Sequence, residues 1–209
     1  MKLHHISSSM MFVNTYILMD EQAGEAAVID PGFMNPELFT FLESCPCKVK
    51  YIIATHGHGD HVGLIGDVKK RFGGEVAIHE ADAHFLTSGA AMKMFAQAGL
   101  NFENVAPDIL LKHGDHLKVG SIDLEVIHTP GHTKGGICLK AAPYLFTGDT
   151  LFFNDIGRTD FEGGSMEEMR HSLQVVLASI EEDLEVLPGH EDFSTLAHEK
   201  ANNPYFKAV

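Results

Sequence analysis

The sequence has few basic residues, few cysteines and no long apolar run. Its 209 residues include 15 Lys and Arg against 29 Asp and Glu, which gives a formal net charge of −14. An acidic excess of this size repels phosphate backbones and anionic lipid, so we expect neither nucleic acid nor a membrane as a partner. The apolar runs are much shorter than the roughly 20 residues that a membrane-spanning helix needs. The N-terminus carries no signal-peptide pattern, so we expect a cytoplasmic protein.

Three cysteines, Cys45, Cys47 and Cys138, do not make a disulfide framework. Cys45 and Cys47 could in principle bind a metal as thiolates, but reduced, half-buried thiols are the expected state. A chain of this length buries roughly 70% of its unfolded surface without covalent help. Its 44% hydrophobic and 21% charged residues are typical of a globular protein. Because no linker-like segment divides the chain, we expect a single domain over residues 1–209.

Short strand-like segments are mixed with helical ones along the chain. Strands are predicted for residues 11–19, 25–29, 49–54, 75–79, 121–128, 144–147 and 184–187. Helices are predicted for residues 36–43, 62–72, 81–100 and 165–180, with Asn35 and Ser165 as expected N-caps. An opening β meander favours mixed sheets with outer helices over a doubly wound nucleotide-binding fold. No glycine-rich phosphate-binding motif is present either.

One predicted helix carries an apolar stripe of Met92, Met94, Phe95 and Leu100. We expect this stripe to pack in the core, as apolar residues at helical spacing usually do. A lid that faces the substrate is the alternative.

The most informative feature is a dense group of potential metal ligands. The chain has 14 histidines, and three of them fall in the stretch His56-Gly57-His58-Gly59-Asp60-His61, directly after a predicted strand. Imidazoles and carboxylates are the ligands that Zn, Fe, Mn or Co accept. A single histidine is more often packed or solvated than bound to a metal. This density at the end of one strand is hard to explain in that way.

Three further candidates follow other predicted strands, each beside a glycine. His132 lies in Pro-Gly-His-Thr, Asp149 in Gly-Asp-Thr and His190 in Pro-Gly-His. Loops at strand ends commonly build binding sites because the scaffold below them is rigid. The candidates are then His56, His58, Asp60, His61, His132, Asp149 and His190. One catalytic zinc takes three protein ligands, so this set suits two ions about 3.5–4 Å apart with a bridging carboxylate.

Together with Val28-Ile29-Asp30-Pro31-Gly32 upstream, these segments resemble the motifs of the metallo-β-lactamase superfamily. The resemblance implies an α+β fold, a four-layer αββα sandwich with the metals at one edge of the paired sheets. It implies one metal on His56, His58, His132 and Asp149, and another on Asp60, His61, Asp149 and His190. Asp30 would support a ligand from behind. The implied cofactors are two divalent ions, with zinc expected and iron or manganese as alternatives.

Within the superfamily, the chain resembles short hydrolases of the glyoxalase II type. The resemblance rests on Gly157-Arg158-Thr159-Asp160-Phe161, on Gly163-Gly164 and on the ending Asn203-Pro204-Tyr205-Phe206. It implies a small-molecule thioester as the substrate, either hydroxyacyl-glutathione or a relative of it. A metal-bound water, its pKa lowered to about 7, would attack the thioester carbonyl, oriented by Asp60 as the catalytic residue. Lys134 and Arg158, near two of the ligand motifs, are expected to bind anionic groups of the substrate.

The chain departs from classical glyoxalase II in two ways. Only 19 residues follow His190, so we do not expect the C-terminal helical domain that helps classical members to hold glutathione. Asp192 also stands where classical members carry a tyrosine. Both departures weaken the expectation of a strict preference for glutathione while leaving the predicted metal ligands in place.

Two alternative functions stay open at this stage. The first is persulfide dioxygenase, a relative that uses one iron held by the equivalents of His56, His132 and Asp149. Its last motif typically reads Pro-Ala-His, where this chain has Pro188-Gly189-His190. The second is a metal-binding module without activity, which is disfavoured because every candidate ligand is present. β-Lactamase activity is not expected, since Asp60 and the Arg158 stretch are glyoxalase-like.

Overall fold

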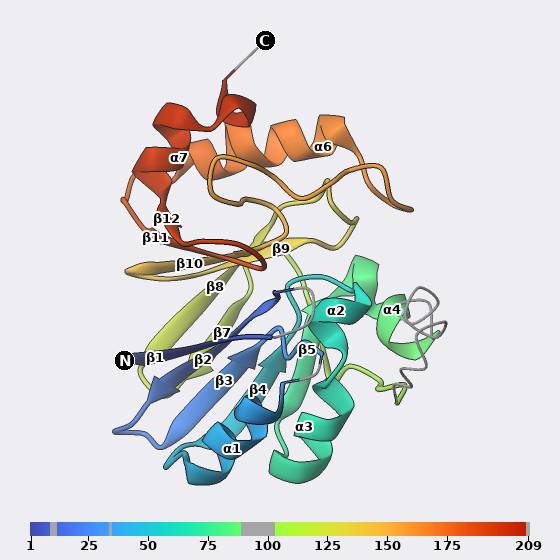
Figure 1. Ribbon diagram of the computed structural model, residues 1–209, viewed down its shortest axis with the longest axis vertical. Coiled ribbons are helices and arrows are strands. Elements are labelled where there is room, and N and C mark those ends of the chain that lie inside the picture. Colours follow the sequence, from blue (N-terminus) through green and yellow to red (C-terminus); the bar gives the residue numbers. More distant parts are fainter. Residues whose placement is uncertain (9–11, 34, 89–102, 208–209) are drawn as a thin grey trace.

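The computed structural model describes residues 1–8, 12–33, 35–88 and 103–207. Two six-stranded sheets pack face to face, and helices cover the outer face of each (Figure 1). This arrangement confirms the αββα sandwich that the sequence motifs implied.

The first sheet has the strand order β1-β2-β3-β4-β5-β6. These strands are β1 (Lys2–Ser7), β2 (Asn14–Asp20), β3 (Glu25–Ile29), β4 (Lys48–Ile53), β5 (Glu75–His79) and β6 (Ile109–Leu111). The first three strands pair antiparallel, and β3 to β6 pair parallel. The parallel strands β3, β4 and β5 therefore all end at one edge of the sheet.

The second sheet has the order β12-β11-β10-β9-β8-β7. Its strands are β7 (His116–Val119), β8 (Ile122–His128), β9 (Ile137–Ala141), β10 (Tyr144–Gly148), β11 (Glu185–Pro188) and β12 (Ser194–Thr195). β8 and β10 both run antiparallel to β9, and β11 runs parallel to β10. The strands β8, β10 and β11 consequently point the same way, and their ends share one edge.

Helices flank the sandwich on both sides (Figure 1). Beside the first sheet lie α1 (Pro36–Ser44), α2 (Gly59–Val62), α3 (Ile65–Phe72), η1 (Glu80–Asp82) and α4 (Ala83–Thr87). Over the second sheet lie α6 (Met166–His171), η3 (Ser172–Val176), η4 (Leu177–Ser179), α7 (Leu196–Asn202) and η5 (Pro204–Phe206). Within the described ranges, no helix is long and apolar enough to cross a bilayer.

Three apolar layers hold the four layers of structure together. The middle layer lies between the sheets and contains Leu18, Leu124 and Phe146, all fully buried. Successive side chains of a strand point to opposite faces, so Ile17 packs with the helices outside the first sheet while Leu18 faces the second sheet. Such two-sided burial makes the sheets rigid supports for the loops at their ends.

Both predicted helix caps are confirmed. The Asn35 side chain accepts a hydrogen bond from the Leu38 backbone N–H at 3.2 Å. The Ser165 hydroxyl accepts one from the Glu168 N–H, also at 3.2 Å. Each cap satisfies one of the unpaired N–H groups at the start of its helix.

The prediction of one helix over residues 62–72 was wrong in its start. The chain turns into α2 already at Gly59, and a break at Gly63 and Leu64 separates it from α3. Asp60 and His61 therefore lie on a short helical turn of their own. The strands of residues 2–7, 109–111, 116–119 and 137–141 and the helix α7 were not predicted, because these short segments carry weak periodicity.

The helix predicted for residues 81–100 is described only at its start. Residues 80–82 form a 3₁₀ turn and residues 83–87 an α-helix. The apolar stripe of Met92, Met94, Phe95 and Leu100 lies outside the described residues. Cys45, Cys47 and Cys138 are free thiols, as expected.

The layer between the sheets predicts a contrast between two leucines. Leu124 of β8 is fully buried there, so Leu124→Ala should lower the free energy of unfolding by about 2–5 kcal/mol. Leu110 of β6 is 52% exposed, so Leu110→Ala should change it by no more than about 0.5 kcal/mol. Urea denaturation of the two variants measures both values. Equal effects would contradict the assignment of this layer as the core.

Candidate metal centre

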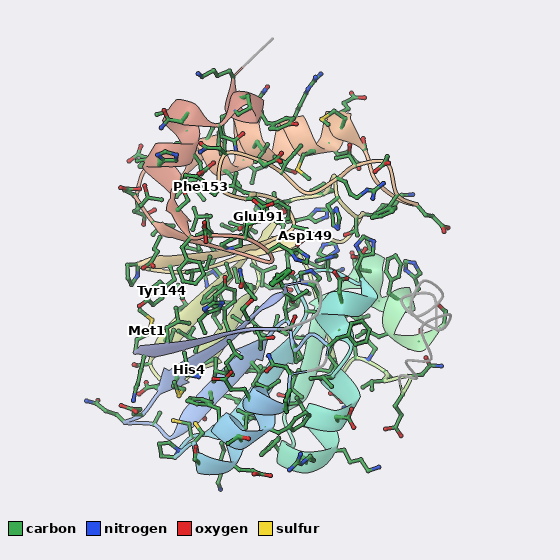
Figure 2. All side chains as sticks on the ribbon, in the orientation of Figure 1. Met1, His4, Tyr144, Asp149, Phe153 and Glu191 are labelled. Atoms are coloured by element: carbon green, nitrogen blue, oxygen red, sulfur yellow. The ribbon has the colours of Figure 1, made fainter. Side chains whose placement is uncertain are left out.

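Loops from both sheets meet at one edge of the sandwich and carry the predicted ligands. His56 and His58 follow β4, and Asp60 and His61 lie on α2. From the second sheet, His132 follows β8, Asp149 follows β10 and His190 follows β11. Figure 2 shows Asp149 where the two halves of the molecule meet, close to Glu191, the neighbour of His190. Seven side chains spread over 135 positions of the sequence, from 56 to 190, are thereby brought together.

Asp149 occupies the centre of this group. Its Oδ2 lies 3.3 Å from His132 Nε2, 3.6 Å from His190 Nε2 and 4.0 Å from His56 Nε2. Its Oδ1 lies 3.3 Å from His61 Nε2. One carboxylate therefore lies among imidazoles from both sheets, with Oδ1 toward His61 and Oδ2 toward the other three, as a ligand shared by two ions would.

The nitrogen and oxygen donors form two groups that Asp149 connects. One group is His56, His58 and His132, and the other is Asp60, His61 and His190; each has its donor atoms within 4.8 Å of one another. A third group, His56, His61 and Asp149, overlaps both. His58 Nδ1 lies 2.8 Å from His132 Nε2, and His61 Nε2 lies 3.2 Å from His190 Nε2.

The chemistry of these donors fits divalent metal ions. His56 Nε2 and Asp149 Oδ1 are buried and have no hydrogen-bond partner among the described residues. Leaving a buried polar atom unpaired costs about 1–3 kcal/mol, so atoms of this kind gathered in one place point to a ligand that they share. Imidazole nitrogens with carboxylate oxygens suit zinc, iron or manganese.

Burial and neighbouring charges set the protonation of the histidines. Burial, together with the nearby His61, lowers the pKa of His56 well below its usual range. Burial, with His132 beside it, lowers the pKa of His58 to about 4. Burial also acts to lower the pKa of His61, but Asp149 and Asp60 outweigh it and raise that pKa. His56 and His58 are thus neutral and ready to bind a metal, whereas His61 must first give up a proton.

A layer of hydrogen bonds behind the ligands fixes how two imidazoles point. Asp30 is buried and accepts hydrogen bonds from the Thr55 N–H at 2.7 Å and the Thr55 hydroxyl at 2.6 Å. His61 Nδ1 donates to Asp30 Oδ2 at 3.0 Å, which leaves its Nε2 facing Asp149. His132 Nδ1 donates to the Arg158 carbonyl at 2.7 Å, which leaves its Nε2 free for a metal. Such partners orient ligand imidazoles and raise their basicity.

Two buried residues of β2 hold the loop of His190, and no motif in the sequence indicated their role. The Asn14 side chain donates to the carbonyls of Pro188 at 3.1 Å and Glu191 at 3.0 Å. The Tyr16 hydroxyl donates to the Pro188 carbonyl at 2.7 Å. The partners of these side chains lie more than 170 residues away, so only the folded structure reveals their role.

Gly189 is required by the close packing around Asp149. A Cβ atom at position 189 would overlap Asp149 Oδ1 and lie 2.7 Å from His61 Cε1. Any larger residue would therefore push the Asp149 carboxylate away from its place between the two ligand groups. The glycine of the Pro-Gly-His motif is thus required in this chain for a steric reason.

The two predicted substrate cations lie in different surroundings. Arg158 forms a two-point ion pair with Asp160, at 2.7 and 2.8 Å, and its guanidinium lies over the Phe161 ring, 3.9 Å from the centroid. Lys134 is exposed and lines an open hollow with Pro130 and Gly163. It forms no ion pair with the part of the chain that the structure describes. Lys134 is therefore the more available of the two positive charges.

Several solved structures share this fold. A B3 metallo-β-lactamase, BLEG-1, has a TM-score of 0.87 at 28% identity, over 99% of this chain and 100% of that chain. The di-iron-bound form of TTHA1623 has a TM-score of 0.84 at 25% identity, over 97% and 99%. ETHE1 from Myxococcus xanthus has a TM-score of 0.81 at 26% identity, over 98% and 84%.

Sequence comparison gives the same family. The hydroxyacylglutathione hydrolase GloC of Haemophilus influenzae is 33% identical over 200 residues, 93% of this chain and 93% of that protein. The family model of the metallo-β-lactamase superfamily matches residues 10–190, which include all of the predicted ligands. The chain therefore belongs to the metallo-β-lactamase superfamily.

Proposed function

We propose that this protein is a binuclear metal-dependent hydrolase that cleaves hydroxyacyl-glutathione or a related small thioester. The observation that carries the proposal is the position of the Asp149 carboxylate between the two ligand groups: Oδ2 lies 3.3 Å from His132 and 3.6 Å from His190, and Oδ1 lies 3.3 Å from His61. The similarity to GloC over nearly the whole chain supports the thioester as substrate. His56, His58 and His132 would hold one ion, Asp60, His61 and His190 the other, and Asp149 both.

The reaction requires a nucleophile and a positive charge beside the carbonyl oxygen. When bound, the two divalent ions supply both, since they lower the pKa of water to about 7 and polarise the carbonyl. The departing thiolate is a stable anion, so no strong general acid is needed. The protein's own task is therefore to hold the thioester and the attacking water in line.

Asp60 is suited to orient the attacking water. Its Oδ2 lies 3.5 Å from His190 Nε2 and 3.9 Å from His61 Nε2, at the edge of the ligand group. Burial acts to raise the pKa of Asp60, but His61 and His190 outweigh it and lower that pKa. Asp60 therefore stays ionised at neutral pH, where its carboxylate can accept a hydrogen bond from the water that attacks.

Lys134 and Arg158 are proposed to hold anionic groups of the substrate. Lys134 offers an exposed ammonium without an ion pair among the described residues. Arg158 would have to exchange its contact with Asp160 for a substrate carboxylate, which the exposed position of both side chains permits. Lys134 and Arg158 both lie in connections of the second sheet, so the thiol carrier would bind on that side of the ligand cluster.

Persulfide dioxygenase is the second candidate, favoured by the similarity to ETHE1. His56, His132 and Asp149, the set that a single iron would need, lie together here as well. Two features argue for the hydrolase instead. Asp60, His61 and His190 form a second complete group, and Gly189 leaves room for Asp149 to face it.

The bridging role of Asp149 predicts unequal effects of two substitutions. Asp149→Ala should lose both ions and nearly all turnover, because it removes an oxygen from each group. His190→Ala should weaken mainly one ion. Elemental analysis after dialysis measures the metal that each variant retains. Equal metal in the two variants would contradict the proposed division of the ligands.

The packing at Gly189 predicts that a single methyl group disturbs the second metal. Gly189→Ala should displace Asp149 Oδ1 from His61, so the ion on Asp60, His61 and His190 should be lost first. Gly114→Ala is the control: at φ +82 it strains the backbone of a turn, but its Cβ meets nothing within 4 Å, so it should keep both ions. Two ions bound with native affinity in Gly189→Ala would show that the steric argument is wrong.

Two assays on one preparation separate the candidate enzymes. The hydrolase needs no oxygen, so lactoyl-glutathione or a simpler acyl thioester should be cleaved under anaerobic conditions, with a high KM. Glutathione persulfide should cause no O₂ uptake. Rapid persulfide-dependent O₂ consumption, with no thioester cleavage, would assign the protein as a dioxygenase.

A further inference from the structure

A buried carboxylate outside the ligand set joins two loops of the metal centre. Asp82 lies in the turn η1, just after β5, and its side chain is fully buried. Its Oδ2 accepts a hydrogen bond from the Gly57 N–H at 3.0 Å, and its Oδ1 accepts one from the Gly135 N–H at 2.7 Å. Each oxygen of the carboxylate thus holds the backbone of a different loop.

The two loops come from different sheets, and both carry candidate ligands. Gly57 stands between His56 and His58, after β4 of the first sheet. Gly135 stands three residues after His132, in the connection from β8 to β9 of the second sheet. His58 Nδ1 and His132 Nε2 lie 2.8 Å apart. The carboxylate therefore spans the same junction between the sheets that a metal on these imidazoles would span.

The backbone at Gly135 packs closely against the Asp82 side chain. A Cβ atom on Gly135 would lie 2.6 Å from Asp82 Cγ and 2.7 Å from Asp82 Cβ, so the loop lies directly against the side chain. Among the described residues, no Lys or Arg pairs with Asp82. Its charge is therefore balanced by the two backbone N–H groups, and charge-assisted bonds of this kind are the stronger ones.

We propose that Asp82 is a positioning residue of the metal centre, which sets the distance between the His56–His58 loop and the His132 loop and thereby the metal affinity of that ligand group. The proposal rests on the metal centre and is independent of which substrate the protein cleaves. Hydrogen-bonding partners behind metal ligands typically change metal affinity by about 10–100-fold.

Asp82→Asn tests this with almost no change in volume. The amide keeps one acceptor oxygen, but its NH₂ group cannot accept a hydrogen bond, so one loop loses its partner. In a His190→Ala background, which leaves His56, His58 and His132 intact, competition with a chromophoric chelator should show Zn²⁺ binding weakened about 10–100-fold. In a His132→Ala background, where the Asp60, His61 and His190 group remains, Asp82→Asn should have little effect.

Asp20→Asn is the matched control for a purely structural role. Asp20 is also buried and also joins the two sheets, since it accepts hydrogen bonds from the N–H groups of Gln22, Ala23 and Ser121. It lies at the opposite end of β2 from Asn14, the residue that contacts the His190 loop. Asp20→Asn should lower the melting temperature of the metal-free protein and leave Zn²⁺ affinity unchanged in both backgrounds.

The results distinguish a role of Asp82 in positioning the metal ligands from a role in folding alone. A loss of affinity confined to the His56, His58 and His132 group supports the proposal. Unchanged affinity, or equal loss in both backgrounds, overturns it. If Asp82→Asn does not fold, Asp82→Ser, which keeps one acceptor and adds no bulk, takes its place. Failure of both to fold beside a folded Asp20→Asn would assign the carboxylate to the fold and overturn the proposal. A thioester assay that fails has no bearing on these results.

Discussion

The metal centre depends on the Asp149 carboxylate being held among imidazoles that come from both sheets. Its distances to His61 and His132 are both 3.3 Å, and these two residues belong to loops of different sheets. His132 and Asp149 both follow strands of the second sheet, whereas His61 reaches Asp149 from the first sheet. The packing of the two sheets, through the apolar layer that contains Leu18 and Phe146, therefore determines the spacing of the donors.

The structure meets this constraint with buried polar side chains behind the ligands. Asp30 orients His61 from the first sheet, and Asn14 of the first sheet holds the His190 loop of the second. Asp82 links the remaining loops. Each of these side chains is buried and hydrogen-bonded to backbone or ligand, so it limits how far a loop can move. The supporting side chains are thus held by contacts of the fold itself, and an ion that binds only the folded protein would stabilise it further by mass action.

The sequence was informative where chemistry is concentrated in short motifs. The segment from His56 to His61, and the glycine-flanked His132, Asp149 and His190, could be recognised because metal ligation needs particular residue types at strand ends. The αββα fold was predicted from the same motifs through a family resemblance and is confirmed. The motifs could only suggest that the seven side chains lie close together, and the structure shows that their donor atoms form overlapping groups within 4.8 Å.

Other features could not be predicted, for physical reasons that individual residues illustrate. Asn14 and Tyr16 act on carbonyls more than 170 positions away, and Asp82 acts through two backbone N–H groups that leave no pattern in the sequence. Arg158, which is expected to bind an anionic group of the substrate, forms a local ion pair with Asp160 that the motif did not indicate. The start of the helix predicted for residues 62–72 was misplaced because glycine has a low helix propensity. In the structure α2 nevertheless begins at Gly59, where its four residues, including His61, are buried.

We propose that Asp149 bridges two metal ions. Anomalous diffraction from crystals of zinc-loaded protein tests it most directly, since each bound ion gives its own peak. We expect two peaks, about 3.5–4 Å apart, with one Asp149 oxygen toward each. One peak should lie beside His56, His58 and His132, and the other beside Asp60, His61 and His190. A single peak at full occupancy in crystals grown with excess zinc would contradict it.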